Sequence, residues 1–199
     1  MNWHFIPPGA PHFGGLWEAG VKSIKHHLRR IMGQANLTYE ELATLLTQIE
    51  AILNSRPLCP ITTDPDDFNP LTPGHFLIGH ALLALPEAEW DCSKISSLSR
   101  WQHLQKLRHD FWKRSVSEYL PRLQQRAKWQ TEQPSIQEGD LVLLREEHTL
   151  PCQWKLARVL EVHPGMDKRV RVVTLKTPNN VLKRPITKIC PLPFQINQS

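Results

Sequence analysis

The sequence predicts an α+β protein in which helices come first and an antiparallel sheet comes last. Three segments before residue 130 repeat their apolar residues at three- and four-residue steps, which is typical of helices. After Gln133-Pro134 the period changes to two, which is typical of strands. The charge changes as well. Residues 1–99 carry 6 Lys or Arg against 10 Asp or Glu, a net charge of −4, and residues 100–199 carry 18 against 9, a net charge of +9.

The chain opens with a short apolar run, Asn2–Ile6, that Pro7-Pro8 stops, and this run predicts one strand. Next, the spacing predicts a helix from Trp17 to Met32, ended by Gly33. Its apolar residues recur at helical steps and form one stripe that faces a core: Trp17, Val21, Ile24, Leu28 and Ile31.

A second line of side chains follows the same steps on a neighbouring edge of this helix: Glu18, Lys22, Lys25 and Arg29. An acid in the first turn suits the helix dipole and stabilises a helix by roughly 0.3–1 kcal/mol. From spacing alone, that interpretation of Glu18 is favoured over a role in a catalytic site. The cations are either a solvated face or a surface that contacts phosphates.

A second helix is predicted to begin after Thr38, because Thr38 and Glu41 have the spacing of a capping box. It ends near Asn54, since the residue before Pro57 avoids helical geometry. The proline-rich stretch Leu58–Pro73 predicts an extended loop. Its acids could suggest calcium, but the spacing lacks the rest of an EF-hand loop, so no cation is expected there: Asp64, Asp66 and Asp67.

A long helical pattern runs from Leu98 to about Trp129, and Pro121 is expected to kink or split it. We interpret its large apolar residues as anchors in a core: Trp101, Leu104, Phe111, Trp112, Tyr119 and Leu123. Trp101, Trp112 and Trp129 are accordingly favoured as core residues over platforms for base stacking. Several basic side chains lie along the same pattern, among them Arg108, Lys113 and Arg114.

The last third contains four apolar segments of alternating pattern, with turns at Pro164-Gly165 and Asn179-Asn180. They predict a small SH3-like antiparallel β-barrel of about 60 residues. We expect the cations of this barrel at exposed positions: Lys155, Arg158, Arg169, Arg171, Lys176, Lys183 and Arg184.

Composition excludes some classes of protein and favours one class of partner. The four cysteines form no close pairs, so a zinc site is not expected. We expect the cysteines to be reduced and their thiols to be mostly buried. No apolar run approaches the roughly 18 residues of a membrane span, and the N-terminus does not have the pattern of a signal peptide, so an intracellular protein without a membrane partner is expected. The basic second half favours a polyanion such as nucleic acid over a merely solvated surface.

The order of several motifs resembles the last part of integrases of Pao/BEL-type LTR retrotransposons. These motifs are "PPGAPHFGGLWEAGVKSIKHHLRR", "LTYEELATLLTQIEAILNSRPL", "LTPGHFLIG" and "RWQHLQKLRHDFWKRSVSEYLPRLQQR". The strand-like segments with "GDLVLL" and "KRPITKICPLP" resemble the C-terminal domain that closes those polyproteins. The resemblance covers nearly the whole chain, and it is the order of the motifs that makes it specific.

The resemblance implies three parts: residues 1–85 as the end of a ribonuclease H-like catalytic core, 86–133 as a helical linker, and 134–194 as the barrel. In such a core two Asp and one Glu hold Mg²⁺ or Mn²⁺ for phosphoryl transfer. The Glu falls on Glu18, and the lysines that reach the phosphates fall on Lys22 and Lys25. The implied partner is DNA, together with the rest of an integrase assembly or further copies of the chain, in the nucleus.

The two aspartates of the family belong to strands upstream of Met1, so we expect this chain to be inactive in strand transfer by itself. Three alternatives follow. In the first, the chain is the C-terminal part of an integrase that binds DNA without reading its sequence. In the second, it is a co-opted or remnant protein-interaction module. In the third, Met1 is an artefact of where a gene model starts. Because the core piece lacks most of its sheet, residues 1–85 are expected to expose apolar surface and either to be loosely ordered or to associate. The barrel is expected to be the better-folded part.

Overall fold

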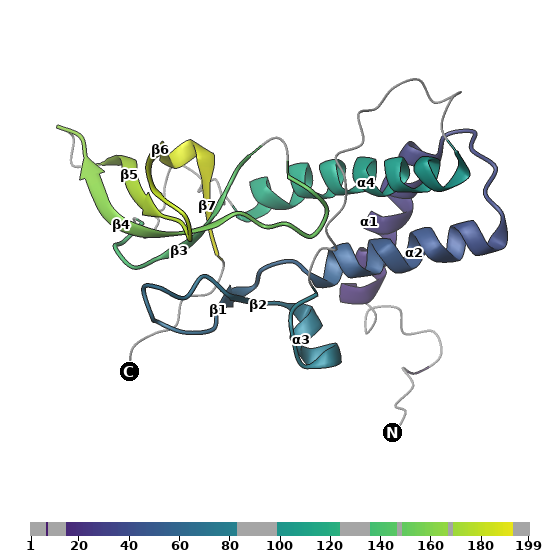
Figure 1. The fold of residues 1–199 in the computed structure, drawn as a ribbon, viewed down its shortest axis with the longest axis horizontal. Helices are drawn as coiled ribbons and strands as arrows, with labels where there is room; N and C mark the ends of the chain where they lie inside the picture. Colours follow the sequence, from purple (N-terminus) through teal and green to yellow (C-terminus); the bar gives the residue numbers. More distant parts are fainter. Residues whose placement is uncertain are drawn as a thin grey trace.

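The structure, a computed structural model, describes residues 7, 15–82, 99–123, 136–146, 149–166 and 169–192. A group of helices lies at one end of the molecule and a sheet at the other, and one long helix runs between them (Figure 1). The predicted strand Asn2–Ile6 lies outside the described residues, as do Cys92 and Trp129. The mixed α+β character is confirmed, with helices first and the sheet last.

The first two helices lie close to where the sequence predicts them. They are α1, Gly15–Met32, and α2, Tyr39–Asn54. The predicted capping box is present. The backbone N–H of Glu41 donates to Thr38 Oγ1 at 3.3 Å, and the N–H of Thr38 donates to Glu41 Oε2 at 2.8 Å. These bonds satisfy two of the N–H groups that would otherwise lack partners at the start of α2.

The long helix α4, Arg100–Leu123, completes a helical core. Its buried side chains pack against those of α2, while the apolar stripe of α1 covers the core from one side. The buried members are Leu45, Ile49, Ile52, Leu104, Leu107, Phe111 and Trp112. The apolar surface expected to be exposed in residues 1–85 is thus covered by α4 along the buried side of α2. It is exposed elsewhere in this range, at Leu46 and Phe76 among others.

The structure corrects one expectation about α4 and narrows a second, the kink or split at Pro121, to a kink. Trp101 is 54% exposed and is not a core anchor, because the first turn of α4 extends past the buried residues of α2. The helix is not split at Pro121, which lies inside it. Since Pro121 is exposed and only two residues from Leu123, the hydrogen bond that it removes lies in the last described turn.

The sheet has five antiparallel strands in the order β6-β5-β4-β3-β7. They are β3, Leu141–Leu144; β4, Leu156–Pro164; β5, Val170–Lys176; β6, Val181–Pro185; and β7, Ile189–Pro191. The last predicted segment contains two strands, because the 3₁₀ turn Ile186–Lys188 separates β6 from β7. As β6 and β7 do not pair with each other, the described sheet is not closed into a barrel.

Both predicted turns are present in the sheet. Gly165 N–H donates to the carbonyl of Arg169 at 2.8 Å, and Thr177 N–H donates to the carbonyl of Asn180 at 2.8 Å. The second turn joins β5 to β6 in register, with Lys176 opposite Val181. Turn residues at these positions therefore set the strand pairing, as expected.

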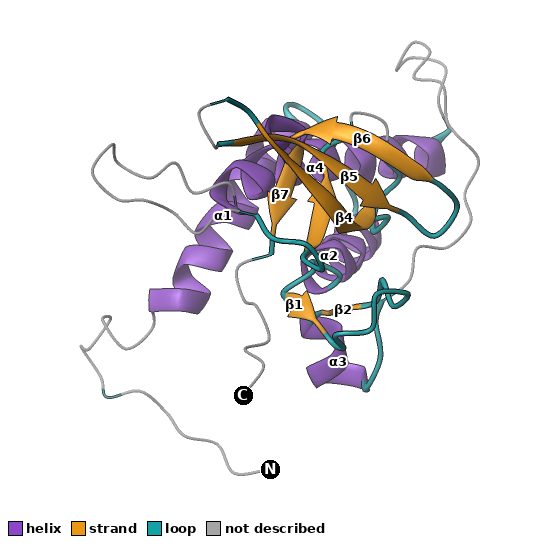
Figure 2. Ribbon diagram, turned by 90° about the vertical axis from the view of Figure 1, so that its left-hand side faces the viewer, coloured by secondary structure: helices purple, strands orange, loops and turns teal. Residues whose placement is uncertain are grey.

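Each face of the sheet is buried at β3, whereas much of β5 and β6 is exposed. One face holds an aliphatic cluster that includes Val142, Val159 and Val173. The other packs Leu141 and Leu143 against the end of α4. The segment after α2 lies along that second face and contains β1, Cys59–Pro60; β2, Pro70–Leu71; and the short helix α3, Pro73–Ile78. Figure 2 shows α4 behind the sheet and the β1–β2 pair below it.

Three aromatic side chains hydrogen-bond the helices, the segment after α2 and the connection between β3 and β4 to one another. Trp112 Nε1 donates to the carbonyl of Thr149 at 2.9 Å. Tyr119 donates through its hydroxyl to the carbonyl of Pro57 at 2.8 Å. Trp154 Nε1 donates to the hydroxyl of Ser55 at 3.1 Å. These bonds and the two cores on α4 hold helices and sheet against each other. No helix in the described part of the chain is both long and apolar enough to cross a membrane.

Candidate nucleic-acid interface

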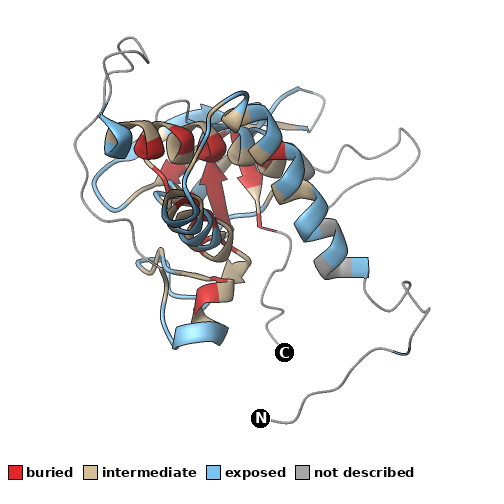
Figure 3. Cartoon of the chain, turned by 90° about the vertical axis from the view of Figure 1, so that its right-hand side faces the viewer, coloured by how far each residue is buried: buried red, intermediate tan, exposed pale blue. Residues whose placement is uncertain are grey.

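The basic edge of α1 is exposed along its length. Glu18, Lys22, Lys25 and Arg29 follow one another at three- and four-residue steps and are all exposed. Figure 3 shows that most of α1 is exposed where it extends away from the other helices. The four predicted side chains therefore do lie along one accessible edge of one helix.

The neighbouring apolar stripe of α1 is only partly buried. Ile24, Leu28 and Ile31 pack against the helical core, as predicted, but Val21 is 47% exposed. The reason is geometric: α1 contacts α4 with its second half, so the predicted apolar stripe is covered only there. The side chain of Trp17 lies outside the described residues.

A buried histidine fixes α1 against α4. His27 is 3% exposed, and its Nε2 lies 3.2 Å from Oε2 of Glu118. Its ring also meets Phe111 edge to face, with 5.6 Å between the ring centres. Burial lowers the pKa of His27, and the Glu118 carboxylate acts in the opposite direction. The contact sets the rotation of α1, and hence the direction in which its basic edge faces.

Glu18 does not belong to a complete metal site in the described part of the chain. No group of three or more His, Cys, Asp or Glu side chains comes together there in a way that could hold an ion. A site with two divalent ions needs several carboxylates close together. The described residues alone therefore do not fit Mg²⁺ or Mn²⁺.

Most of the cations predicted on the sheet are exposed. They are Lys155, Arg169, Arg171, Lys183 and Arg184. On β6, Lys183 lies opposite Thr174 and Arg184 opposite Val173, so the two side chains leave the strand on opposite faces. Val173 is buried in the aliphatic cluster, so Arg184 leaves β6 on the face of the sheet that carries this cluster.

Arg158 corrects the prediction for the sheet, because it is only 4% exposed. Its Nη1 donates to the carbonyl of Gly139 at 2.9 Å, and its Nη2 donates to the carbonyls of Asp67 at 2.7 Å and Thr62 at 3.3 Å. The segment 61–68 crosses the face of β4 from which Arg158 projects, and this segment is what buries it. Arg158 is therefore a structural contact between loop and sheet, and it does not lie on an exposed surface.

Lys176 also lies on the face that the loop covers, opposite Arg158 on the neighbouring strand. It forms an ion pair with Asp66 and is half-buried, so it is not an exposed position of the sheet either. The acids of this loop thus contact basic residues and polar groups of the protein. Asp67 accepts from the hydroxyl of Thr62 at 2.7 Å, and its own pKa is lowered, chiefly by the backbone N–H of Asn69.

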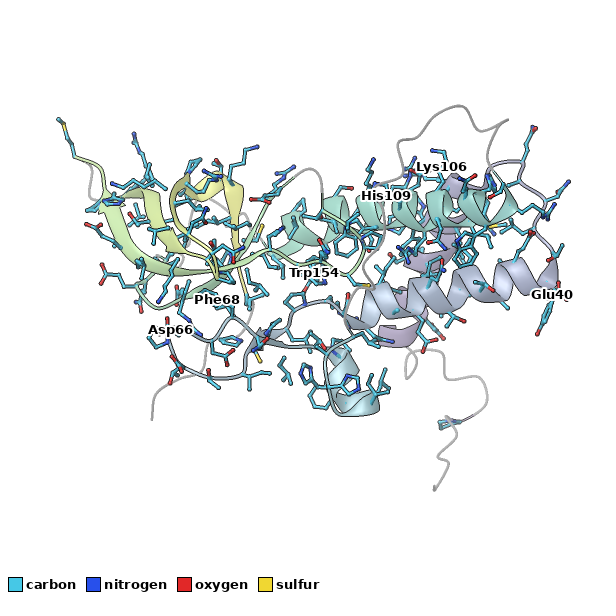
Figure 4. The ribbon with its side chains drawn as sticks, in the orientation of Figure 1. Glu40, Asp66, Phe68, Lys106, His109 and Trp154 are labelled. Carbon is cyan, nitrogen blue, oxygen red and sulfur yellow. The ribbon has the colours of Figure 1, made fainter. Side chains whose placement is uncertain are left out.

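The sequence reasoning overlooked two members of a basic face on α4. Lys106, His109 and Lys113 follow one another at three- and four-residue steps, and Figure 4 labels the first two along the helix. Burial, followed by the charge of Lys113, lowers the pKa of His109, while Asp110 acts in the opposite direction. Lys106 lies 3.3 Å from Asp110, which neutralises part of this face. The same step count that found the edge of α1 could have found these residues.

The described cysteines are thiols and not disulfides: Cys59, Cys152 and Cys190. Cys190 is fully buried in the sheet, and this burial raises its pKa to about 11. Cys59 and Cys152 are half-buried. The expectation of reduced, mostly buried thiols therefore applies fully to Cys190 and in part to the other two.

Comparison with known proteins identifies one similar family. Residues 99–192 match a family of unknown function, DUF5641. This range begins just before α4 and ends just after β7, so it contains the long helix and the whole five-stranded sheet. No curated protein matches the chain, and no solved structure does.

Proposed function

We propose that this chain is the C-terminal part of a Pao/BEL-type retrotransposon integrase and that it binds DNA without reading its sequence. The observation that carries the proposal is the exposure of the predicted basic side chains. Three lie on α1, and five lie on the sheet and its connections. Cations at the surface neutralise phosphates, and this contact is sequence-independent.

The proposal extends to the ancestry of the fold. In it, α1 and α2 are the last helices of a ribonuclease H-like core, and the five-stranded sheet is an SH3-like domain with an open edge. The motif order supports the first statement, and the strand count and the apolar cluster on each face of the sheet support the second. Within this proposal Glu18 is a metal ligand by descent, and DNA as partner makes the nucleus the place of action.

Binding of a labelled duplex at several salt concentrations tests the proposal. We expect two duplexes of unrelated sequence and equal length to bind with similar affinity, and we expect both affinities to fall steeply as salt rises. If neither duplex shows salt-sensitive binding near physiological ionic strength, the proposal is wrong. Strand transfer by this chain alone, with Mg²⁺ or Mn²⁺, would contradict the inactive state that we assign to it.

A second candidate function is a protein-interaction module, and one feature of α3 favours it. Phe76, Leu77 and Ile78 are consecutive and are 74%, 64% and 49% exposed. Contiguous exposed apolar side chains mark protein contacts in soluble proteins. A second copy of the chain is the occupant to test, by sedimentation at increasing concentration with Phe76→Ser as the matched variant. A wild-type chain that stays monomeric throughout removes self-association through α3.

A further inference from the structure

A cavity of about 570 Å³ lies at one end of the sheet, where the segment after α2 faces it. Three points of the strands define this end of the sheet. They are the end of β3 at Leu144, the start of β4 at Leu156, and the turn between β5 and β6 after Lys176. In an antiparallel sheet these three points lie at the same end. The volume is within the range of roughly 300–1,000 Å³ that is usual for small-molecule sites.

The walls of the cavity combine aromatic and apolar side chains. Phe68 packs against the sheet core and also lines the cavity, and Trp154 lines it from the segment that leads into β4. Figure 4 labels both residues. Leu156 and Leu182 complete the apolar part. Such a surface accepts a flat, weakly polar group by stacking and burial.

The polar side chains around this surface include cations, amides and hydroxyls. Lys155 and Arg184 are exposed and line the cavity, as does Asn179 in the turn between β5 and β6. Arg184 uses one of its five N–H donors on the carbonyl of Lys183 at 3.2 Å. Glu146 is the one acid among the described lining residues. Its carboxylate can accept from N–H groups, whereas the two cations suit a phosphate.

We propose that this cavity takes an unpaired nucleotide of a single-stranded nucleic acid. The base lies against Phe68 and the apolar wall, and the phosphate lies near Lys155 and Arg184. Stacking of a base on an aromatic ring, with a cation beside its backbone, is how proteins hold single strands without much sequence preference. This inference rests on the proposed function, since it assigns one single-strand site on a protein that otherwise contacts duplex phosphates.

Two labelled single strands of equal length test the inference, one of them oligothymidylate and the other an abasic strand with the same phosphates. We expect the full-length chain to bind the thymidylate strand roughly tenfold more tightly, because the abasic strand has nothing to stack. If both strands bind equally with a steep salt dependence, the cavity inference is wrong and the proposed function stands. If neither strand binds and duplex does not bind, both are wrong.

Two variants assign the binding of single strands to this cavity. Phe68→Leu keeps an apolar side chain but removes the aromatic face, and it should bring the ratio of the two affinities close to one. Asn179→Glu adds a carboxylate at the cavity without touching the core, and it should weaken the binding of both strands because it repels their phosphates. Asn36→Glu is the matched control, an exposed asparagine that does not line the cavity, and it should keep both wild-type affinities. A ratio that Phe68→Leu leaves unchanged, or affinities that Asn179→Glu leaves unchanged, would overturn the proposal.

Discussion

Arg158 on β4 donates to the carbonyl oxygen of Asp67 at 2.7 Å, and these two residues are 91 positions apart in the sequence. The bond joins the segment after α2 to the sheet. Arg158 also reaches the carbonyls of Thr62 and Gly139, so one side chain connects three separate parts of the chain. Arg158, which was predicted as an exposed cation that contacts DNA, thus stabilises the packing of the loop against the sheet.

Arg158→Met should lower the free energy of unfolding by about 2–4 kcal/mol, because it removes the hydrogen bonds that a buried guanidinium donates to three carbonyl groups. Urea unfolding measures this. Lys188→Met is the control, since Lys188 is exposed and its replacement should change the stability by no more than about 0.5 kcal/mol. A folded Arg158→Met protein of wild-type stability would show that this contact between loop and sheet contributes nothing.

Phe111→Ala should destabilise the chain by about 3–5 kcal/mol, because Phe111 is fully buried between the helices. Because α4 also carries Leu120, which packs against the sheet, the helices and the sheet should unfold in one transition. Circular dichroism and tryptophan fluorescence followed in the same denaturant series test this. Trp101→Ala, on the same helix but exposed, should cost little. Two separate transitions in the wild type would instead support a loosely ordered first part.

Glu41 gives the stability a specific pH dependence. The side chain of Arg100, and then the backbone N–H of Thr38, lower the pKa of Glu41 from 4.5 to about 2. Since the folded-state pKa is the lower one, the stabilisation is fully present above pH 4.5 and is lost as the pH falls towards 2. Glu41→Gln, which keeps a side chain suited to the capping box, should remove this part of the acid sensitivity.

Unfolding curves between pH 6 and pH 2, for the wild type and Glu41→Gln, measure the effect. In an Arg100→Gln background the same substitution should change the pH dependence much less, because the two side chains act together. Equal effects in both backgrounds would mean that the ion pair between Arg100 and Glu41 does not cause the shift.

Cys190 should resist alkylation in the folded protein. It is fully buried, and burial raises its pKa to about 11, so the reactive thiolate is scarce near neutral pH. Cys59, which is half-buried, is the internal comparison. Peptide mass mapping after brief treatment with iodoacetamide should find Cys59 modified first and Cys190 modified only in denaturant. Rapid labelling of Cys190 in the native protein would show that β7 opens readily.

Local signals in the sequence predicted much of the secondary structure. Thr38 and Glu41 are three residues apart, so the capping box of α2 could be read directly, and the turns at Gly165 and Asn180 had the expected residue types. The exposed edge of α1 followed from helical spacing alone. Each of these features depends on neighbours in the chain, which is what periodicity and propensity describe.

The misplaced residues depend on contacts between distant parts of the chain. Alternation along β4 predicted an exposed Arg158, but the segment 61–68 covers that face, and the sequence does not say which loop crosses which sheet. The spacing of α2 predicts an apolar face but does not identify the element that covers it, and in the structure α4 packs against part of that face. The cavity beside Phe68 is also made by such a crossing.

The salt dependence of duplex binding tests the central claim most directly when it is measured on matched variants. The logarithm of the affinity should fall linearly with the logarithm of the salt concentration, by about 0.9 for each phosphate contact. Replacing Lys22, Lys25 and Arg29 together by Gln should make this slope clearly shallower, while Lys188→Gln should leave it unchanged. A wild-type affinity that does not depend on salt, or a slope that the triple variant keeps, would contradict DNA binding through the basic edge of α1.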